Sequence, residues 1–488
     1  MNANNFHGKT AAFLFVLCAM AMATSFANAY DNKQENAQII VYNFNDPGIG
    51  FNDPTPATPV GGNTGTTVGQ QRLNAFSYAA KLWSKQLNSK VPITIVAAFD
   101  PLPCSADSAV LGAAGANNAF ADFPKAEKPA TWYNAALANK IAKQTLIEPT
   151  GYPYYDADIF AEFNADLGKP NCLEGSGFYL GFDNNHGTLI DLVTVLLHEF
   201  AHGLGFQTFT DGYTGEQFLG MPHIWDHFLY DNAQKRTWVQ MTNAERQVSS
   251  LNTQGLVWDG EKVTNAAPRV LARGVPELHT VPDIANGAEI LLGTASFGPA
   301  ITSTGIRAKV GQVSDQVNGT GLACNPLNAA NAAAIFGKIA LIDRGACAFT
   351  VKVRNAQNVG ALAVLVADNI PGSPPNNLGG LDPSITIPAA RITNADGLSL
   401  KAVLSTGEVA ATLAVNLARL NGADKRGRVF LYAPNPFADG SSISHYDVSA
   451  FPNQLMEFSI NSDLQHQVSP PSDLTKSLLD DTGWAGDE

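Results

Sequence analysis

Two histidines and a glutamate near the middle of the chain have the spacing of a metal centre. In VTVLLHEFAHGLGF, residues 193–206, His198 and His202 are four residues apart and Glu199 follows the first. On a helix this spacing puts both imidazoles on one face, about one turn apart, where they can bind one ion. Zinc lowers the pKa of a bound water to about 7, and a nearby carboxylate can take its proton as the water attacks a carbonyl. The pattern predicts Zn²⁺ on His198 and His202, with Glu199 as general base.

The sequence around this short motif favours the metal over a chance match. Residues 188–204 are nearly all apolar up to His198, which predicts a buried helix that starts after Thr188 or Asp191 and ends in the glycines that follow the motif. The alternative is two core histidines and an incidental glutamate. Such groups would be costly to bury without a partner, so we expect an ion between them.

A catalytic zinc usually has a third protein ligand, and the motif does not supply it. Three residues after Gly205 the chain has Thr208. The candidates in the following segments are Glu216, His223, Asp226 and His227. The two histidines of MPHIWDHFLYD, residues 221–231, are again four apart, although the same segment also reads as an amphipathic stretch that packs its apolar side chains.

A distant histidine and methionine extend the motif. His445 lies in GSSISHYDVSAFPNQLMEFSIN, residues 440–461, and Met456 follows eleven residues later. The order His-Glu-x-x-His-x-x-Gly, then His, then Met in a turn resembles the metzincin zinc peptidases, and the long separation resembles their leishmanolysin-like members. The resemblance implies that His445 is the third zinc ligand and that Met456 forms an apolar floor beneath the metal. Tyr446 would contact the oxyanion or, equally well, serve as a core tyrosine.

The segment between the motif and His445 resembles a different module. The string GKIALIDRGACAFTVKVRNAQNVGALAVLVADN, residues 337–369, with Cys324 upstream, is similar to protease-associated (PA) domains. The resemblance implies a small α/β domain that guides or restricts substrates and performs no chemistry. A nucleotide-binding module is the alternative, but no Gly-x-Gly-x-x-Gly opens the predicted helix.

We therefore predict an interrupted organisation. Residues 1–29 are a secretory signal, because Lys9 precedes the apolar run 11–23 and ANA, residues 27–29, is a small-residue cleavage site. The fold class is α+β: a metzincin-like catalytic domain, with a mixed sheet and an active-site helix, interrupted by the PA domain. The predicted parts are 30–270 for the first catalytic part, 271–418 for the PA domain and 419–488 for the second catalytic part.

Periodicity and turn residues place the main elements of these parts. The predicted strands of the first part are 38–46, 91–99, 156–165 and 177–183, with a helix over 68–88. Residues 336–368 predict a strand, a helix and an apolar strand, followed by a strand over 384–393 and a helix that starts at Asn394. The tail 470–484 resembles the closing helix of several secreted metallopeptidases.

Charge and cysteine usage restrict partners and compartment. The formal net charge of −13 argues against nucleic acid and anionic membranes as partners. Once the signal is removed, the cysteines are Cys104, Cys172, Cys324 and Cys347. An even number in an exported chain predicts two disulfides, and we expect Cys104–Cys172 and Cys324–Cys347 because each pair lies in one predicted domain. A zinc held by cysteines is the alternative, without a Cys-x-x-Cys pair to support it.

Together these features predict a secreted or periplasmic zinc endopeptidase that acts on protein or peptide substrates. Two other classes of function are open: an exported peptide-binding protein with a PA domain and a non-proteolytic metal site, and a metallohydrolase of a non-protein amide. The intact Glu199 between the two histidines favours an enzyme, because a pure binding protein has no use for a general base. The sequence indicates no oligomeric state.

Overall fold

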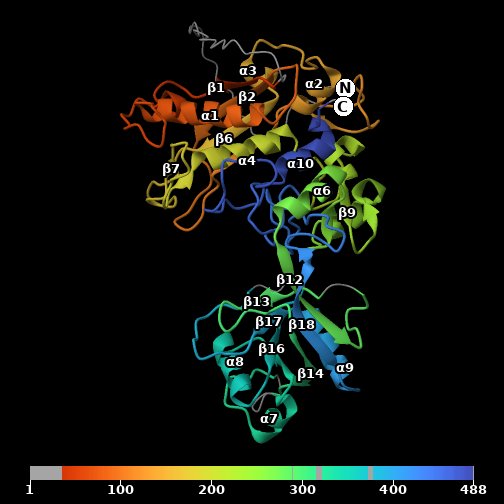
Figure 1. Ribbon diagram of the computed structural model, residues 1–488. Helices are drawn as coiled ribbons and strands as arrows, with labels where there is room; N and C mark the ends of the chain where they lie inside the picture. Colours follow the sequence, from red (N-terminus) through yellow and green to blue (C-terminus); the bar gives the residue numbers. More distant parts are fainter. Residues whose placement is uncertain (1–35, 288–289, 315–320, 372–376, 487–488) are drawn as a thin grey trace.

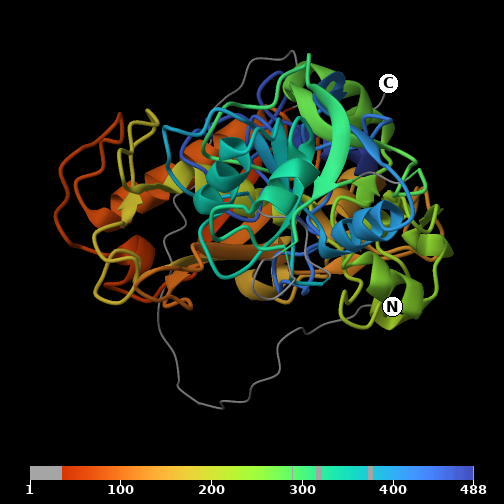
Figure 2. The same ribbon diagram turned by 90° about the horizontal axis from the view of Figure 1, so that it is seen from below.

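The computed structural model describes residues 36–287, 290–314, 321–371 and 377–486. The predicted signal, 1–29, lies outside these ranges. Figure 1 shows two units joined by the ribbon of β12 and β18, and from below, in Figure 2, the second unit lies in front of the first. Over the described ranges, no helix combines the length and apolar character needed to cross a bilayer.

The first unit is built on a mixed sheet. Its strands, in spatial order, are β1 (Ile39–Asn43), β2 (Ile93–Asp100), β6 (Ile159–Asn164) and β3 (Gly112–Ala116). The first three run parallel, and β3 runs antiparallel at the edge next to β6. This arrangement confirms the predicted strands near 38–46, 91–99 and 156–165, whereas β3 was not predicted from the sequence.

Two long helices pack on this sheet and on each other. They are α1 (Val68–Ser84), which begins at the N-cap Thr67, and α4 (Leu192–Leu204), which contains the His-Glu-x-x-His motif. Phe76 of α1 packs against Phe163 of β6 and Phe200 of α4, with ring centroids 4.9 and 5.9 Å apart. The core that they share includes side chains from residues 37–271 and again from 420–484, so it draws on both ends of the chain.

Shorter elements surround this core. The helices are α2 (Ala135–Ala142), α3 (Pro153–Asp156), α5 (Asn243–Ser249), α6 (Glu261–Val270) and α10 (Thr475–Leu479). The small sheets pair β4 (Ala119–Phe120) with β5 (Tyr133–Asn134), β7 (Phe178–Tyr179) with β8 (Ile190–Asp191), and β9 (Leu229–Asp231) with β10 (Arg236–Thr237) and β11 (Leu256–Trp258).

Two predicted elements are shorter than expected, for local reasons. The strand predicted over 177–183 is only β7, because Phe182 donates its N–H to the Gly61 carbonyl and Asp183 accepts from Asn185, which turns the chain away. The tail 470–484 contains α10 of five residues, and the following turn ends at Trp484 with Gly483 at a φ of 123°. A left-handed φ of this kind suits glycine and breaks the helix.

The second unit has a seven-stranded sheet. In spatial order the strands are β12 (Arg273–Val281), β18 (Ala410–Leu420), β14 (Ile306–Gln312), β15 (Ile339–Asp343), β16 (Ala363–Ala367), β17 (Ala389–Ile392) and β13 (Gly293–Thr294). From β14 to β17 the strands are parallel, and the outer strands are antiparallel. The helices are α7 (Ala329–Ile335), α8 (Phe349–Asn358) and α9 (Asn394–Leu404). The elements predicted over 336–368 and after Asn394 are confirmed, and the strand predicted over 384–393 is the shorter β17.

Both faces of this second sheet are covered, as its uninterrupted apolar strands require. In β15, Leu341 faces a cluster with Leu400 of α9, while Ile342 faces a cluster with Val353 of α8. These two clusters contain residues 278–413 and are separate from the core of the first unit.

The two disulfides predicted from the sequence are confirmed. Cys104 bonds to Cys172 in the first unit, and Cys324 bonds to Cys347 in the second. Disulfides form and persist in oxidising compartments, so this pairing is consistent with an extracytoplasmic location.

The ends of the second unit lie side by side. Arg273, at the start of β12, is paired with Leu420, at the end of β18, and Asn421 donates its N–H to the Ala272 carbonyl at 2.9 Å. An insertion whose ends meet can leave its host intact. We therefore propose that 30–270 and 419–488 form one domain and that 271–418 is inserted in it.

Excision of the second unit tests this division. We expect a chain that lacks residues 274–419, with Arg273 joined to Leu420 through an Asn-Gly turn, to fold and bind one zinc. Two-residue Asn-Gly loops suit antiparallel partners, and the shared core is left complete. The midpoint of thermal unfolding should fall by less than about 5 °C, which is roughly 3 kcal/mol for a domain of this size. Calorimetry and zinc content check the result, and aggregation of the shortened chain would argue against separate domains.

Candidate metal centre

The motif helix α4 begins and ends at residues that fix its position. Asp191 is the N-cap, rather than Thr188, and its carboxylate accepts from the Thr194 N–H at 2.8 Å. Gly205, with a φ of 125°, ends the helix. Inside it, a Cβ on Gly203 would lie 2.3 Å from the Ile159 side chain, so glycine lets the helix lie directly on β6.

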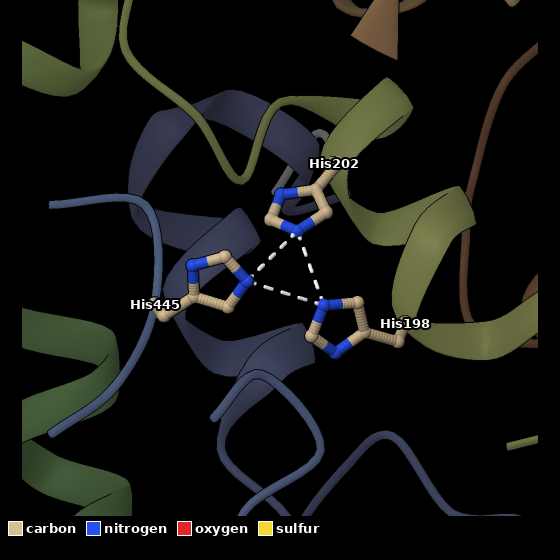
Figure 3. Close-up of side chains that lie close together, drawn as sticks. All are labelled: His198, His202 and His445. Atoms are coloured by element: carbon tan, nitrogen blue, oxygen red, sulfur yellow. Dashed lines mark hydrogen bonds between the residues drawn. The ribbon is translucent and has the colours of Figure 1, made fainter. Parts of the chain in front are cut away.

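Three histidines meet at this helix, as Figure 3 shows. The Nε2 atoms of His198 and His202 are 3.2 Å apart, and the Nε2 atom of His445 lies 3.2 Å from that of His202 and 3.3 Å from that of His198. All three side chains are buried. The structure thus brings His445 to the helical pair across a sequence separation of 243 residues.

Each imidazole is oriented by a backbone carbonyl. The Nδ1 atom of His198 is 2.7 Å from the Leu455 carbonyl, that of His202 is 2.7 Å from the Phe206 carbonyl, and that of His445 is 2.7 Å from the Ser441 carbonyl. A carbonyl can only accept, so each Nδ1 carries the proton and donates it. Each neutral ring then directs the lone pair of Nε2 at the other two rings.

Three converging lone pairs repel one another unless a cation lies between them. Zinc binds imidazole nitrogen at about 2.0–2.1 Å with tetrahedral geometry, which separates two ligand nitrogens by about 3.3–3.4 Å. The observed Nε2 separations of 3.2 to 3.3 Å fit that spacing. The carbonyl acceptors behind the rings are typical of metal-binding histidines. These residues therefore fit a zinc ion.

Burial also keeps the rings unprotonated. It lowers the pKa of His198 to about 4 and that of His202 to about 3, where the charge of His198 adds to the effect. The pKa of His445 is well below its usual value because of burial and the charges of the other two rings. A neutral imidazole is the form that binds metal.

The segment around His445 is held by backbone hydrogen bonds. Tyr432 donates its N–H to the His445 carbonyl, and Tyr446 donates to the carbonyl of Met456. Met456 is completely buried in the core, and its neighbour Leu455 supplies the carbonyl behind His198. The 454–457 turn therefore lies directly behind His198, and the place of Met456 beneath a metal stays a prediction.

Glu199 lies between α4 and the edge strand β3. Its side chain is 7% exposed and accepts a hydrogen bond from the Ala114 N–H. Burial raises the pKa of Glu199 to about 8, and the Ala114 hydrogen bond counteracts part of this rise. A Cβ on Gly112 would be 3.1 Å from the Glu199 Cγ, so the small residues of β3 leave room for the carboxylate.

The other candidate ligands have different partners. His223 Nε2 contacts the Asn134 side-chain oxygen at 2.6 Å, and His227 Nε2 contacts the Thr131 hydroxyl at 3.1 Å. Asp226 accepts from two threonine hydroxyls, and Glu216 is exposed. Tyr446 is buried, which favours its role as a core tyrosine. Burial and the charges of Asp473 and Asp481 raise the pKa of its hydroxyl well above the usual value.

Sequence reasoning missed the groups that orient the site. The three carbonyls and the Ala114 N–H are backbone atoms, so no residue type announces them. The segment GAAGA, residues 112–116, has neither β-branched nor aromatic side chains, which strand prediction depends on. Its run of small residues is the one signal that another part of the protein approaches closely.

The burial of these groups predicts how the stability of the metal-free protein depends on pH. The lowered histidine pKa values give stability that is fully present above about pH 6.5. This stability is lost as the pH falls, because the unfolded chain then takes up protons that the folded protein does not. The raised pKa of Glu199 has the opposite effect between pH 4.5 and about pH 8, where stability increases as the pH falls. With up to three histidines against one glutamate, the free energy of unfolding should fall between pH 6.5 and 5, by about 1.4 kcal/mol per pH unit for each net proton.

Urea unfolding of chelator-treated protein at several pH values measures this dependence. His445→Ala is the matched variant, because it removes one of the three histidines and should make the acid-side slope shallower. An unchanged slope in that variant would mean that His445 takes up a proton in the folded state.

Comparisons with known proteins identify one module. The family model described as the PA domain matches residues 309–400. These residues are a PA domain. The module lies within the second unit and agrees with the resemblance seen in the sequence.

Similar proteins match this chain over short stretches. The leucine aminopeptidase 2 of Arthroderma otae is 42% identical over 79 residues, which is 16% of each chain. The vacuolar-sorting receptor 5 of Arabidopsis thaliana is 40% identical over 92 residues, which is 17% of this chain and 15% of the receptor. A solved zinc aminopeptidase from Bacillus subtilis is 26% identical, with 32% of this chain and 36% of that chain covered and a TM-score of 0.22. The chain thus spans about a sixth of the length of these curated relatives.

Proposed function

We propose that this protein is a zinc-dependent endopeptidase of the metzincin type, with the long insertion of leishmanolysin-like members. His198, His202 and His445 would bind the metal and Glu199 would be the general base. The observation that carries the proposal is the convergence of three imidazole lone pairs beside a buried carboxylate. Several curated relatives are named leucine aminopeptidases, which is in accord with a peptidase in general and not with the endopeptidase in particular.

The chemistry divides between the metal and the protein. A zinc ion held by the three histidines would supply Lewis acidity, lower the pKa of water beside it and favour the ionised form of Glu199. Glu199 would then take the proton of the attacking water and later donate it to the leaving amine. The Ala114 N–H, which donates to the same carboxylate, would hold it in place for both transfers.

The edge strand β3 is suited to hold an extended substrate. Leu111 and Asn117 flank β3 at its two ends, and both face β6. The Leu111 carbonyl accepts from the Asn164 N–H, and the Asn117 N–H donates to the Asp158 carbonyl. Because the direction of the backbone groups alternates along a strand, the N–H and C=O groups of Gly112 and Ala116 and the C=O of Ala114 point to the open edge. The Ala114 N–H, on the same edge, donates to Glu199. A peptide could pair with this edge in the manner of an added strand, with its scissile bond near Glu199.

This edge is the feature that favours cleavage within a chain. A strand-like substrate can extend past the metal in both directions, which an endopeptidase requires. The second candidate is an aminopeptidase, which the names of the relatives favour. Those relatives match only part of this chain, so their names do not decide between the two. The exported location expected from the signal and the two disulfides suits either enzyme.

Blocked peptides distinguish the candidates. The zinc-loaded protein should cleave casein and an internally quenched peptide with an acetylated N-terminus, and a chelator should stop both reactions. An aminopeptidase would cleave the same peptide only when its N-terminus is free of the acetyl group. Zinc binding without cleavage of either would favour the peptide-binding protein, or a hydrolase of a non-protein amide. A wild-type protein that binds no zinc would overturn the whole proposal.

A further inference from the structure

A buried aspartate lies behind the position where the motif lacks a ligand. Thr208, three residues after Gly205, donates its hydroxyl to Asp226 Oδ1 at 2.6 Å. The Thr210 hydroxyl donates to Asp226 Oδ2 at 2.6 Å, and the backbone N–H of His223 donates to the same oxygen at 3.0 Å. The Asp226 side chain is completely buried, so protein groups supply all the hydrogen bonds that compensate for its burial.

The loop that Asp226 holds, residues 206–210, is bonded to one of the three histidines and to the residue that precedes another. At its start, the Phe206 carbonyl accepts from Nδ1 of His202 at 2.7 Å. Two residues later, the Thr208 N–H points at the hydroxyl of Ser444 at 3.4 Å, and Ser444 directly precedes His445. The loop therefore connects the ligand on the helix with the ligand that comes from the distant part of the chain.

Aromatic packing ties the same three segments together. The Phe206 ring lies 4.7 Å from that of Trp225, next to Asp226, and 5.1 Å from that of Tyr446, next to His445. Movement of this loop would therefore shift the carbonyl behind His202 and the segment of His445 together. A short anchor with two fixed oxygens restricts such movement more than apolar contacts alone.

From these contacts we infer that Asp226 is a positioning residue of the metal centre: it fixes loop 206–210 and through it the rings of His202 and His445. The inference rests on the proposed function, because it concerns the zinc site of that function. In this arrangement Thr208 takes part in the site by binding the anchor instead of the metal.

The variant Asp226→Asn tests the inference in the full-length protein. Asparagine keeps the size of the side chain but replaces one acceptor oxygen by an NH₂ group that cannot accept from a hydroxyl or an N–H. We expect the zinc dissociation constant to rise about 10–100-fold, the usual effect of removing a group that orients a ligand. We also expect the visible absorption of the Co²⁺-substituted protein to change, because those bands report the ligand geometry.

Asp158→Asn is the matched control. Asp158 is 1% exposed and also accepts three hydrogen bonds, from the N–H and hydroxyl of Thr94 and from the Asn139 amide. Thr94 and Asn139, the partners of Asp158, are not among the residues whose carbonyls orient the three histidine rings. We expect this variant to lose a similar amount of thermal stability and to keep the zinc affinity and the Co²⁺ spectrum of the wild type.

Thr208 provides a second route if Asp226→Asn does not fold. Thr208→Val removes, at nearly constant volume, the hydroxyl that donates to Asp226 and accepts from the Thr210 N–H, and it should weaken zinc binding. Thr208→Ser keeps the hydroxyl and should restore the affinity. Wild-type zinc affinity and Co²⁺ spectrum in Asp226→Asn or Thr208→Val overturn the inference, and so does an equal loss of affinity in Asp158→Asn. If the wild type binds no zinc, the proposed function fails, and the inference fails with it.

Discussion

Replacing Glu199 with glutamine should leave zinc bound and remove most of the turnover. The three ligand rings are oriented by the carbonyls of Leu455, Phe206 and Ser441, none of which the substitution touches. Glutamine can still accept from the Ala114 N–H through its amide oxygen, but it cannot take a proton from water. General-base catalysis contributes about 10²–10⁴-fold, so kcat on the blocked peptide should fall by about that factor.

Zinc content by atomic absorption and kcat on one preparation check both halves of this result. Glu216→Gln is the control, because Glu216 is exposed and belongs to the same stretch of chain after the motif. It should keep both zinc and turnover. Near wild-type cleavage by Glu199→Gln would exclude the general-base role. Loss of zinc from this variant would mean that the carboxylate is needed to hold the metal site together.

The local part of the site could be predicted from the sequence, because its geometry is set by helix periodicity. His198 and His202 are one turn apart in any regular helix, and the apolar residues before them require that helix to be buried. The cap at Asp191 and the end at Gly205 follow from ordinary preferences at helix termini. The disulfides also followed from local reasoning, since each pair lies in one unit.

The distant part of the site could not be derived in this way. Nothing in the residues near His445 fixes its distance from α4, and only a family resemblance suggested it. The chain achieves the approach through the shared core, in which Trp484 donates to the Leu204 carbonyl and the Leu455 carbonyl accepts from His198. Such contacts between chain ends depend on the tertiary fold and leave no periodic signal.

The segment 221–231 shows how a local pattern can mislead. His223 and His227 have the same four-residue spacing as the motif pair, but they lie in a 3-10 turn, Ile224–His227, and its entry. A spacing of four brings two side chains together only on a regular α-helix. The turn instead directs His223 to Asn134 and His227 to Thr131. A four-residue spacing therefore indicates a pair of metal ligands only where the sequence also predicts a regular α-helix.

His445→Ala should abolish tight zinc binding, and this is the sharpest test of the site. The substitution leaves two imidazoles and removes the proposed third ligand, which would join residues 419–488 to the motif helix. Loss of a direct ligand should exceed the roughly 10–100-fold cost of losing an orienting group, so we expect the zinc dissociation constant to rise by about 10³-fold or more. Such a change equals about 4 kcal/mol of binding free energy.

The same loss should appear in thermal unfolding. In the proposed site only the folded wild type offers zinc all three ligands, so saturating zinc should raise its unfolding midpoint and leave that of His445→Ala nearly unchanged. His227→Ala is the control, since that ring contacts Thr131 and lies outside the cluster, and it should respond to zinc as the wild type does. If His445→Ala keeps wild-type affinity, the third ligand lies elsewhere, and the metal cannot be what joins the two parts of the first unit. If His445→Ala loses the zinc-dependent stabilisation and His227→Ala keeps it, the ion stabilises the fold as well as taking part in the chemistry. The bond between His445 and the ion would then hold residues 419–488 to the motif helix of the first part.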